Sequence, residues 1–413
     1  MTALSPWYQA LDRHAPRLDG LRGIAILLVV LYHTCRYPLA TTPGEQAFIT
    51  VVSMGWMGVD LFFVLSGFLI TSILVRQRES PSYFRTFYAR RVIRIFPLYY
   101  AALVLFLYVL PPLTGNPEGF WTEGSDRETL WYWLFLSNFQ NAFTGNWQHH
   151  FLEVTWSLAI EEQFYLFWPL LVWTTSRAGL VKSCVAIMVG SLALRLAVLW
   201  IGAPNDQFLY TFTPCRLDEL AAGALVAVLA ADPARLAMLS RIARPLFGAS
   251  LAVFVGIVVV ERLRIGEILA AAPAASPKLA ASLYVGWTTS PFIQGPGFTL
   301  LALAGAALVV RAMAAEPASL LARFLESRAL RIFGKYSFAL YLLHVLGGEI
   351  ASAIFHPDRF VAAGGGFLAA QFGYWAAVLV CSMALSLLSW VALESPFHRL
   401  RRFVPYRQRE DGG

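Results

Sequence analysis

The sequence predicts an all-α, polytopic integral membrane protein with about ten transmembrane helices around a polar cavity. Hydrophobic residues make up 58% of the 413 residues and charged residues only 14%, whereas a soluble domain has about a quarter of its residues charged. The mean hydropathy is +0.59. The apolar residues gather in stretches long enough to cross about 30 Å of hydrocarbon, and most basic residues lie between those stretches.

Ten apolar stretches are predicted to span the bilayer. They lie near residues 20–39, 55–75, 91–110, 153–175, 181–201, 212–231, 243–261, 293–311, 332–354 and 370–393. The aromatic segment around Trp131–Phe139 is too short to cross, and we expect it at the interface or over the outer mouth. The chain reads as one transmembrane domain, 1–413, with a core over 18–397 and a basic cytoplasmic tail over 398–413.

The basic residues predict the orientation, because Lys and Arg accumulate in cytoplasmic loops. With the N-terminus inside, 24 of the 32 Lys and Arg residues fall in cytoplasmic segments, 6 fall outside, and Arg195 and Arg216 fall within spans. Ten spans then place both termini in the cytoplasm. The net charge of +7 is therefore explained by basic residues in the loops of a membrane protein, and no nucleic-acid partner is predicted. The four cysteines stand singly, so no metal site or disulfide framework is expected.

The first predicted span carries Asp19, Arg22 and His33. Arg22 and His33 are eleven positions apart, close to three helical turns, so their side chains point from one helix face about 16 Å apart. Ionisable groups inside a membrane are expensive and are functional candidates for that reason. The alternative is a structural histidine packed between helices.

The predicted topology places other polar residues at a depth similar to that of His33, from mid-membrane to the outer half. They are Asp60, Ser66, Glu161, Glu162, Arg216, Asp218, Glu219 and His344. Together they predict a shared polar cavity. A carboxylate beside an imidazole raises its basicity and fixes its tautomer, so Glu161 or Asp60 would support His33 as a general base.

Four of these residues, Arg216, Asp218, His344 and Glu162, are candidates for binding a substrate. The alternative is that carboxylates such as Asp218 and Glu219 pair with Arg216 and hold helices together. In the outer loop near 111–152, we expect His149 and His150 to be a solvated pair rather than substrate ligands.

Arginines mark the predicted cytoplasmic side. Arg90, Arg91 and Arg94 open the third span at helical spacing, and Arg22 and Lys335 face the same compartment. Guanidinium groups favour bidentate contacts with phosphate. The pattern predicts a long donor that has phosphates at one end and a reactive group at the other. Plain anchoring by basic loop residues is the alternative.

These segments, taken in order, resemble the membrane-bound acyltransferase-3 family, whose members O-acylate sugars and other acceptors. The matching segments are Leu18–Arg22 with His33 after ten intervening residues, Phe62–Phe68, Arg90–Pro97, Trp156–Tyr165 and Gly334–His344. The resemblance implies acyl-CoA, chiefly acetyl-CoA, as a donor reached from the cytoplasm, and an essential histidine, here His33, with Arg22 as its partner. It also implies a carbohydrate or other hydroxyl acceptor and a bacterial inner (plasma) membrane. Some members carry an extracytoplasmic hydrolase-like domain, which this sequence does not show. A one-component transfer or a separate periplasmic partner is then implied.

The sequence therefore predicts an acyl-CoA-dependent O-acyltransferase with His33, Glu161 and Asp60 as catalytic residues. Arg22, Arg90, Arg91, Arg94 and Lys335 would bind the donor, without a metal. Direct transfer and a transient acyl-histidine both remain open, as do the acyl length and the acceptor. The alternative function is a multi-pass transporter of an anionic or glycan-linked substrate, although we see no repeat symmetry or matching pair of broken spans.

Overall fold

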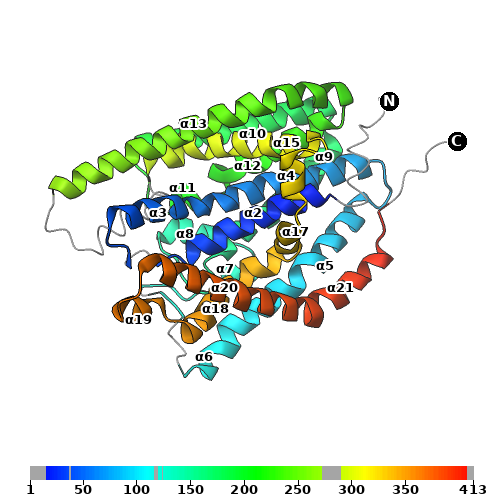
Figure 1. Ribbon diagram of the computed structural model, residues 1–413. Coiled ribbons are helices and arrows are strands. Elements are labelled where there is room, and N and C mark those ends of the chain that lie inside the picture. Colours follow the sequence, from blue (N-terminus) through cyan, green and yellow to red (C-terminus); the bar gives the residue numbers. More distant parts are fainter. Residues whose placement is uncertain (1–14, 37–38, 116–119, 123, 272–289, 407–413) are drawn as a thin grey trace.

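The computed structural model describes residues 15–36, 39–115, 120–122, 124–271 and 290–406. The predicted linker near 270–277 lies mostly outside the described residues, as does the end of the predicted tail. All regular secondary structure in the described part is helical, apart from one isolated antiparallel bridge between Trp121 and His149 (Figure 1). The predicted all-α class is confirmed.

Ten long helices correspond to the ten predicted spans. They are α2 (Pro16–His33), α4 (Met57–Gln77), α5 (Tyr83–Val104), α9 (Thr155–Thr174), α10 (Arg177–Ile201), α12 (Thr213–Ala230), α13 (Pro233–Ala271), α15 (Phe298–Ala314), α18 (Ser337–Ile354) and α20 (Phe367–Ser389). Shorter helices connect or extend them: α3 (Pro43–Ser53), α6 (Leu110–Leu113), α7 (Leu130–Trp133), α8 (Ser137–Thr144), α11 (Phe208–Thr211), α16 (Leu320–Leu325), α17 (Arg328–Lys335), α19 (Pro357–Ala362) and α21 (Ser395–Arg399). Single turns of 3₁₀ or π helix are η2 (Met54–Trp56), η3 (Leu105–Val109), η5 (Ile293–Gly297), η6 (Trp390–Glu394) and η7 (Leu400–Phe403).

Seven helical segments of the described chain are long and apolar enough to cross a membrane. The other three predicted spans are α2, α9 and α12, each of which carries at least two charged residues that lower its mean hydropathy. The protein is therefore a multi-pass membrane protein, while the number of ten spans stays a prediction. The first described helix begins, and the last one ends, at the same end of the bundle (Figure 1).

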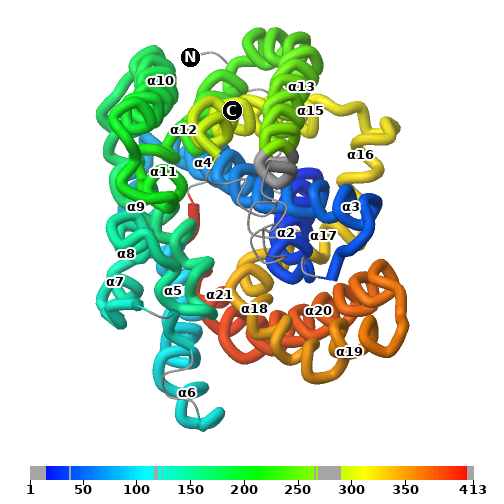
Figure 2. Tube along the Cα trace, turned by 90° about the vertical axis from the view of Figure 1, so that its left-hand side faces the viewer, coloured from blue at the N-terminus to red at the C-terminus, as the bar shows by residue number. Residues whose placement is uncertain are grey.

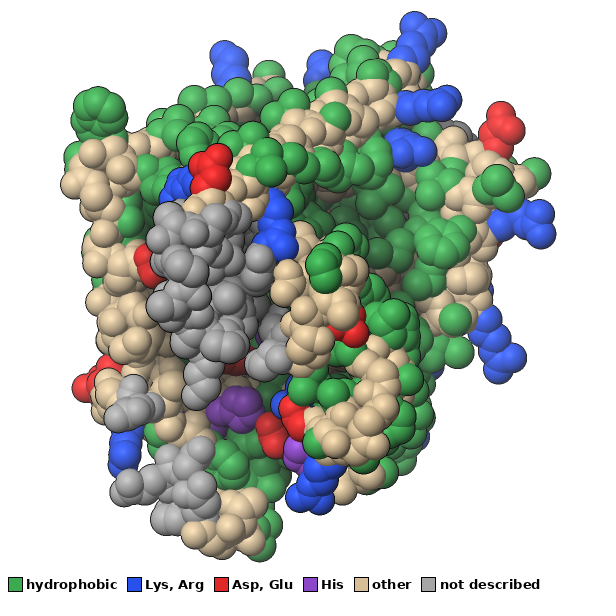
Figure 3. Space-filling view, turned by 60° about the vertical axis from the view of Figure 1, so that its left-hand side comes forward, with side chains coloured by type: hydrophobic (Ala, Val, Ile, Leu, Met, Phe, Trp, Pro, Cys, Tyr) green, Lys and Arg blue, Asp and Glu red, His purple; other side chains and the backbone are tan. Residues whose placement is uncertain are grey.

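Burial separates central helices from peripheral ones. In the apolar window of Pro43–Gln77, which includes α4, 67% of the residues are buried, whereas only 17% are buried in the window of Pro233–Arg264, which lies in α13. Figure 2 shows α2 and α4 near the middle of the bundle and α13, α10 and α20 around it. Hydrophobic side chains cover much of the surface seen in Figure 3. Such an apolar outer surface is suited to lipid.

Small residues bring the central helices α4 and α12 together. A Cβ atom on Gly67 would lie 1.9 Å from the carbonyl oxygen of Leu220, and one on Gly223 would lie 1.9 Å from that of Val64. Only glycine permits this approach at both positions, as at other close helix contacts in membranes. The close packing leaves α4 free to present its opposite face to the site described below.

Candidate active site

A cavity is lined by residues of α2, α4, α5, α9 and α18, and we call it the arginine cavity. It encloses about 940 Å³ of empty space, with the open space at its mouth included. Its walls are largely apolar side chains of α4. The polar residues that line it are Arg22, Ser66, Arg91, Arg94, Ser157, Glu161, Tyr165, Ser337 and Tyr341. A mainly apolar cavity with a few convergent polar groups is typical of a small-molecule site.

Three arginines carry positive charge into the arginine cavity. Arg22 comes from α2, and Arg91 and Arg94 lie about one turn apart on one face of α5. No hydrogen bond or ion pair joins any of these three guanidinium groups to another described residue, and the Arg91 Nε atom is buried without a partner. Glu161 is the one carboxylate among the lining residues. The cavity therefore holds an excess of positive charge and suits an anionic ligand.

Hydrogen bonds fix the position of Glu161 in the wall of the arginine cavity. The Tyr165 hydroxyl donates to Glu161 Oε2 over 2.8 Å. The hydroxyl groups of Tyr165 and Ser66 also contact each other, and since Tyr165 gives its proton to Glu161, Ser66 is the donor in that contact. The expected support of His33 by Glu161 is not seen, because the carboxylate is bonded to Tyr165 instead.

A second cavity lies beyond the last turn of α2, and we call it the histidine cavity. It encloses about 530 Å³ of empty space and is lined by His33, Thr34, Cys35, Arg36, His150, Glu153, Val345, Gly348, Glu349 and Tyr374. Unlike the arginine cavity, it contains acidic and basic groups in similar numbers. In the lower part of Figure 3, histidine, acidic and basic side chains lie close together on the surface. Mixed hydrogen-bond donors and acceptors suit a hydroxyl-rich ligand.

His33 is the last residue of α2 and is exposed. The helix therefore ends before residue 39, where the predicted span ends. Arg36 lies beyond the helix, and its backbone N–H donates to Oε1 of Gln371 on α20 at 2.8 Å. The His33 Nδ1 atom lies 3.1 Å from the Val29 carbonyl oxygen and 3.2 Å from Nε2 of His344. His344, on α18, is fully buried. The structure thus brings two predicted site residues together.

Only a thin layer separates the two cavities. Along α18, Tyr341 lines the arginine cavity, and His344, three residues later, contacts His33. The Tyr341 hydroxyl and Ser157 Oγ are hydrogen-bonded at 2.6 Å within this layer. Three residues of helix rise by about 5 Å, so the cavities adjoin each other. The expected single polar cavity is divided into two.

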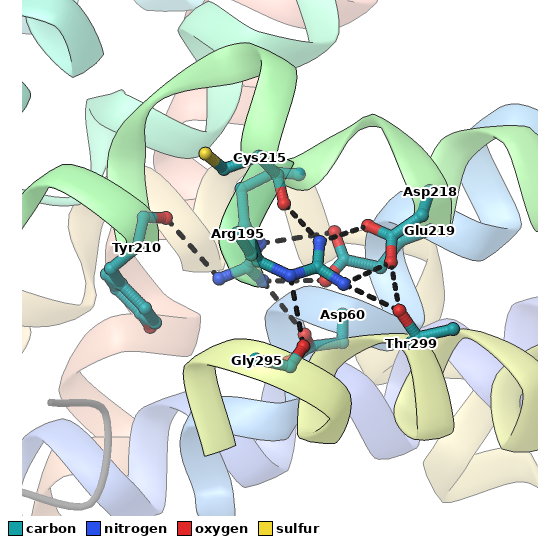
Figure 4. A network of polar contacts seen from close by, with 9 residues as sticks. Asp60, Arg195, Tyr210, Cys215, Asp218, Glu219, Gly295 and Thr299 are labelled. Carbon is teal, nitrogen blue, oxygen red and sulfur yellow. Dashed lines mark hydrogen bonds and ion pairs between the residues drawn. The ribbon is translucent and has the colours of Figure 1, made fainter. Parts of the chain in front are cut away.

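Asp60 and the two span arginines lie instead in a buried network, shown in Figure 4. Arg216 pairs with Asp60 at 2.8 Å and with Glu219 at 3.0 Å. Arg195 binds both carboxylate oxygens of Asp218, at 2.7 and 3.0 Å. These contacts join α4, α10 and α12, and none of the five charged residues is more than 2% exposed.

The network corrects part of the predicted site. The Asp60 carboxylate is bound by Arg216, and no hydrogen bond joins it to His33. Arg216 and Asp218 line neither cavity. Pairing between helices, the alternative considered for these residues, describes their contacts in the structure.

His344 and three further predicted residues line neither cavity. Arg90 donates from Nε to the carbonyl oxygen of Val404 at 2.6 Å, and so holds the C-terminal segment against α5. Lys335 is exposed, with its ammonium group 4.9 and 5.1 Å from the centroids of two aromatic rings. Glu162 follows Glu161 in α9 but does not line the arginine cavity.

The adjacent residues His149 and His150 have contrasting environments. His149 is only 1% exposed, with the Trp121 ring 4.9 Å away, and burial lowers its pKa to about 4. The prediction of a solvated residue was wrong for His149, since the backbone bridge to Trp121 folds the loop over it. His150 lines the histidine cavity, and its hydrogen bond to Glu349, at 3.2 Å, raises its pKa.

Several site residues were missed from the sequence. Tyr165 follows Glu161 by four positions, and Tyr341 precedes His344 by three, so helical spacing carried a signal for both. Arg36 and Glu349 carried no such signal, because they reach the histidine cavity from segments far apart in the chain. Among the described residues, no three His, Cys, Asp or Glu side chains gather closely enough to hold a metal ion.

The chain is similar to several bacterial O-acetyltransferases. YrhL of Bacillus subtilis (strain 168) is 30% identical over 348 residues, which cover 80% of this chain and 48% of YrhL. The O-acetyltransferase OatA of Staphylococcus aureus (strain NCTC 8325 / PS 47) is 29% identical, with 80% and 50% covered. The peptidoglycan O-acetyltransferase OatA of Listeria monocytogenes (serovar 1/2a, strain EGD-e) is 25% identical, with 80% and 49% covered. The chain thus spans about half the length of these relatives.

No solved structure gives a significant match to the chain. The family model described as an acyltransferase domain matches residues 16–391, from the first residue of α2 to the end of α20 and beyond. Both cavities lie within this range. The resemblance of the sequence motifs is thereby confirmed, and the protein belongs to the acyltransferase-3 family.

Proposed function

We propose that the protein is a membrane O-acyltransferase that moves an acyl group, acetyl in the first instance, from acyl-CoA to a hydroxyl group of a glycan. The observation that carries this proposal is the placement of α2, which contributes Arg22 to the arginine cavity and His33 to the adjoining histidine cavity. The similarity to O-acetyltransferases supports acetyl as the group, and the peptidoglycan O-acetyltransferase OatA of Listeria monocytogenes supports peptidoglycan as the acceptor.

The arginine cavity is the proposed donor site. Its three guanidinium groups outnumber its single carboxylate, and this excess of positive charge favours the phosphates of coenzyme A. Arg22, Arg91 and Arg94 would bind them by charge-assisted hydrogen bonds. The positive-inside prediction puts this cavity on the cytoplasmic side, where acyl-CoA is available. The pantetheine arm would pass the layer around Tyr341 and Ser157 and bring the thioester to His33.

The histidine cavity is the proposed acceptor site. His33 removes the proton from an acceptor hydroxyl, whose oxygen attacks the thioester carbonyl carbon and forms the new C–O bond. The C–S bond then breaks, and the imidazolium proton goes to the departing thiolate, so that an ester and free coenzyme A leave. A transient acyl-His33 would give the same products in two steps.

Acetyl transfer by the purified protein in lipid nanodiscs tests this proposal. With acetyl-CoA and peptidoglycan fragments, we expect ester-linked acetyl groups by mass spectrometry and an equal release of free thiol. His33→Ala should lower this rate by about 100-fold or more without changing the melting temperature. His356→Ala is the matched control, because that side chain is 42% exposed and lines neither cavity.

Two outcomes would contradict the proposal. A His33→Ala protein with the wild-type rate would refute the role of His33. Movement of a glycan across the bilayer without thiol release would instead support the transporter alternative.

A further inference from the structure

We infer that His344 is a positioning residue that holds His33 in the tautomer with its proton on Nδ1, so that Nε2 is left free to accept a proton. This inference rests on the proposed function, in which His33 is the base. It concerns how the base is prepared, and it follows from which ring nitrogens face hydrogen-bond acceptors.

The tautomer of His344 is set by its own helix. Its Nδ1 atom lies 2.9 Å from the carbonyl oxygen of Tyr341 and 3.2 Å from that of Leu340. A carbonyl oxygen only accepts hydrogen bonds, so Nδ1 must carry the proton. A neutral imidazole has one N–H group, and Nε2 of His344 is therefore an acceptor.

The neutral state of His344 follows from its surroundings. The side chain is fully buried, and its recorded hydrogen-bond contacts are two backbone carbonyl groups and His33. Within the described chain, no carboxylate forms a hydrogen bond or ion pair with it. A buried imidazolium without a counter-charge is strongly unfavourable, so the neutral ring is the stable form.

Two acceptors then face the same nitrogen of His33. Its Nδ1 atom lies 3.2 Å from the acceptor Nε2 of His344 and 3.1 Å from the Val29 carbonyl oxygen. Both contacts require a proton on Nδ1, which makes this nitrogen a shared donor. The lone pair of His33 is therefore on Nε2, for which the described residues provide no hydrogen-bond partner.

The opposite tautomer would leave His33 unable to act as proposed. A histidine side chain in water prefers the proton on Nε2, so the form that the site needs must be imposed by its neighbours. A neighbouring group that fixes the imidazole tautomer is the usual device for preparing a histidine base, although a carboxylate or a carbonyl more often supplies it. Here the second histidine takes that role, together with the Val29 carbonyl group.

The direct test is the ¹⁵N spectrum of histidine-labelled protein in lipid, recorded at a pH where His33 is neutral. The His33 signals are assigned by their loss in His33→Asn. We expect a protonated Nδ1 and an unprotonated Nε2 in the wild type. In His344→Leu we expect a fraction of the Nε2–H form to appear, because the side-chain acceptor is gone.

Kinetics distinguish positioning from a general structural role. His344→Leu should lower kcat by about tenfold or more and leave KM for acetyl-CoA within about twofold, since the arginine cavity is untouched. His344→Gln keeps an acceptor oxygen near the place of Nε2, and it should restore the Nδ1–H form and most of the turnover. His356→Gln is the control for an equivalent change outside both cavities.

The outcomes separate this inference from the proposed function. A wild-type His33 with its proton on Nε2 overturns the inference, and this result needs neither a folded His344 variant nor any activity. Equal turnover in His344→Leu and the wild type overturns it as well. If the Nδ1–H form is found but His33→Ala remains active, the proposed function fails while the tautomer assignment stands.

Discussion

Two groups of arginines lie in the same helix bundle and differ in how they are paired. In the buried network, Arg195 and Arg216 face three carboxylates, those of Asp60, Asp218 and Glu219, at distances of 2.7 to 3.0 Å. In the arginine cavity, three guanidinium groups share a single lining carboxylate, Glu161, and none is bonded to another described residue.

This difference in pairing separates an arginine that holds helices together from one that can bind a ligand. A buried guanidinium group that is neutralised by bound carboxylates is not available to bind a ligand. One at the edge of a cavity with unused N–H groups can bind an anion without first breaking an ion pair. The predicted depth placed Arg216 towards the outside and Arg91 and Arg94 at the cytoplasmic side. It did not predict which group is paired, because depth says nothing about which side chains meet.

The largest expected effect of a substitution is on stability, in the buried network. Arg216→Met leaves Asp60 and Glu219 buried without their counter-charge, and we expect a loss of about 3–5 kcal/mol in the free energy of unfolding. Thermal denaturation in detergent measures this loss. Arg235→Met is the control, because its side chain is 53% exposed and lies 3.6 Å from Asp232, so a change of no more than about 1 kcal/mol is expected. Equal stability of both variants would show that the network is dispensable.

The arginine cavity should show the opposite result, with binding weakened and stability kept. Arg91→Gln and Arg94→Gln each remove a charged donor, which we expect to weaken CoA binding by about 10- to 100-fold. Titration calorimetry measures the affinity, and the melting temperature should stay near that of the wild type. Arg85→Gln, an exposed residue of the same helix α5 that lines neither cavity, should bind CoA normally. If Arg91→Gln and Arg94→Gln instead destabilise the fold as Arg216→Met does, the contrast between the two groups disappears.

The His150–Glu349 pair gives the weakest expected effect, because its side chains are 49% and 56% exposed. The hydrogen bond that His150 Nε2 donates to Glu349 Oε1 raises the pKa of His150 above its ordinary value of 6.5. The pair therefore stabilises the fold fully below about pH 6.5 and loses its effect as the pH rises through the raised pKa. We expect Glu349→Gln to lower stability by at most about 1 kcal/mol at pH 5.5 and by less at pH 8.5.

Melting curves at the two pH values test this expectation, and the His150→Gln background is the control. Without the imidazole, the effect of Glu349→Gln should no longer depend on pH. An effect that grows as the pH rises would mean that another partner, and not His150, interacts with Glu349.

The sequence by itself determined the class of the protein and most of its helix positions. Apolar length and the distribution of Lys and Arg report on the bilayer, and every predicted span coincides with a long helix. Arg22 and His33 were identified because a charged or ionisable group in an apolar helix can be recognised without knowledge of its neighbours.

Only the tertiary structure decided which groups meet. His33 contacts His344 and not a carboxylate, and Asp60 forms an ion pair with Arg216. The physical reason is that burial in lipid is a property of one segment, whereas hydrogen bonds between helices depend on how segments hundreds of residues apart are rotated and packed.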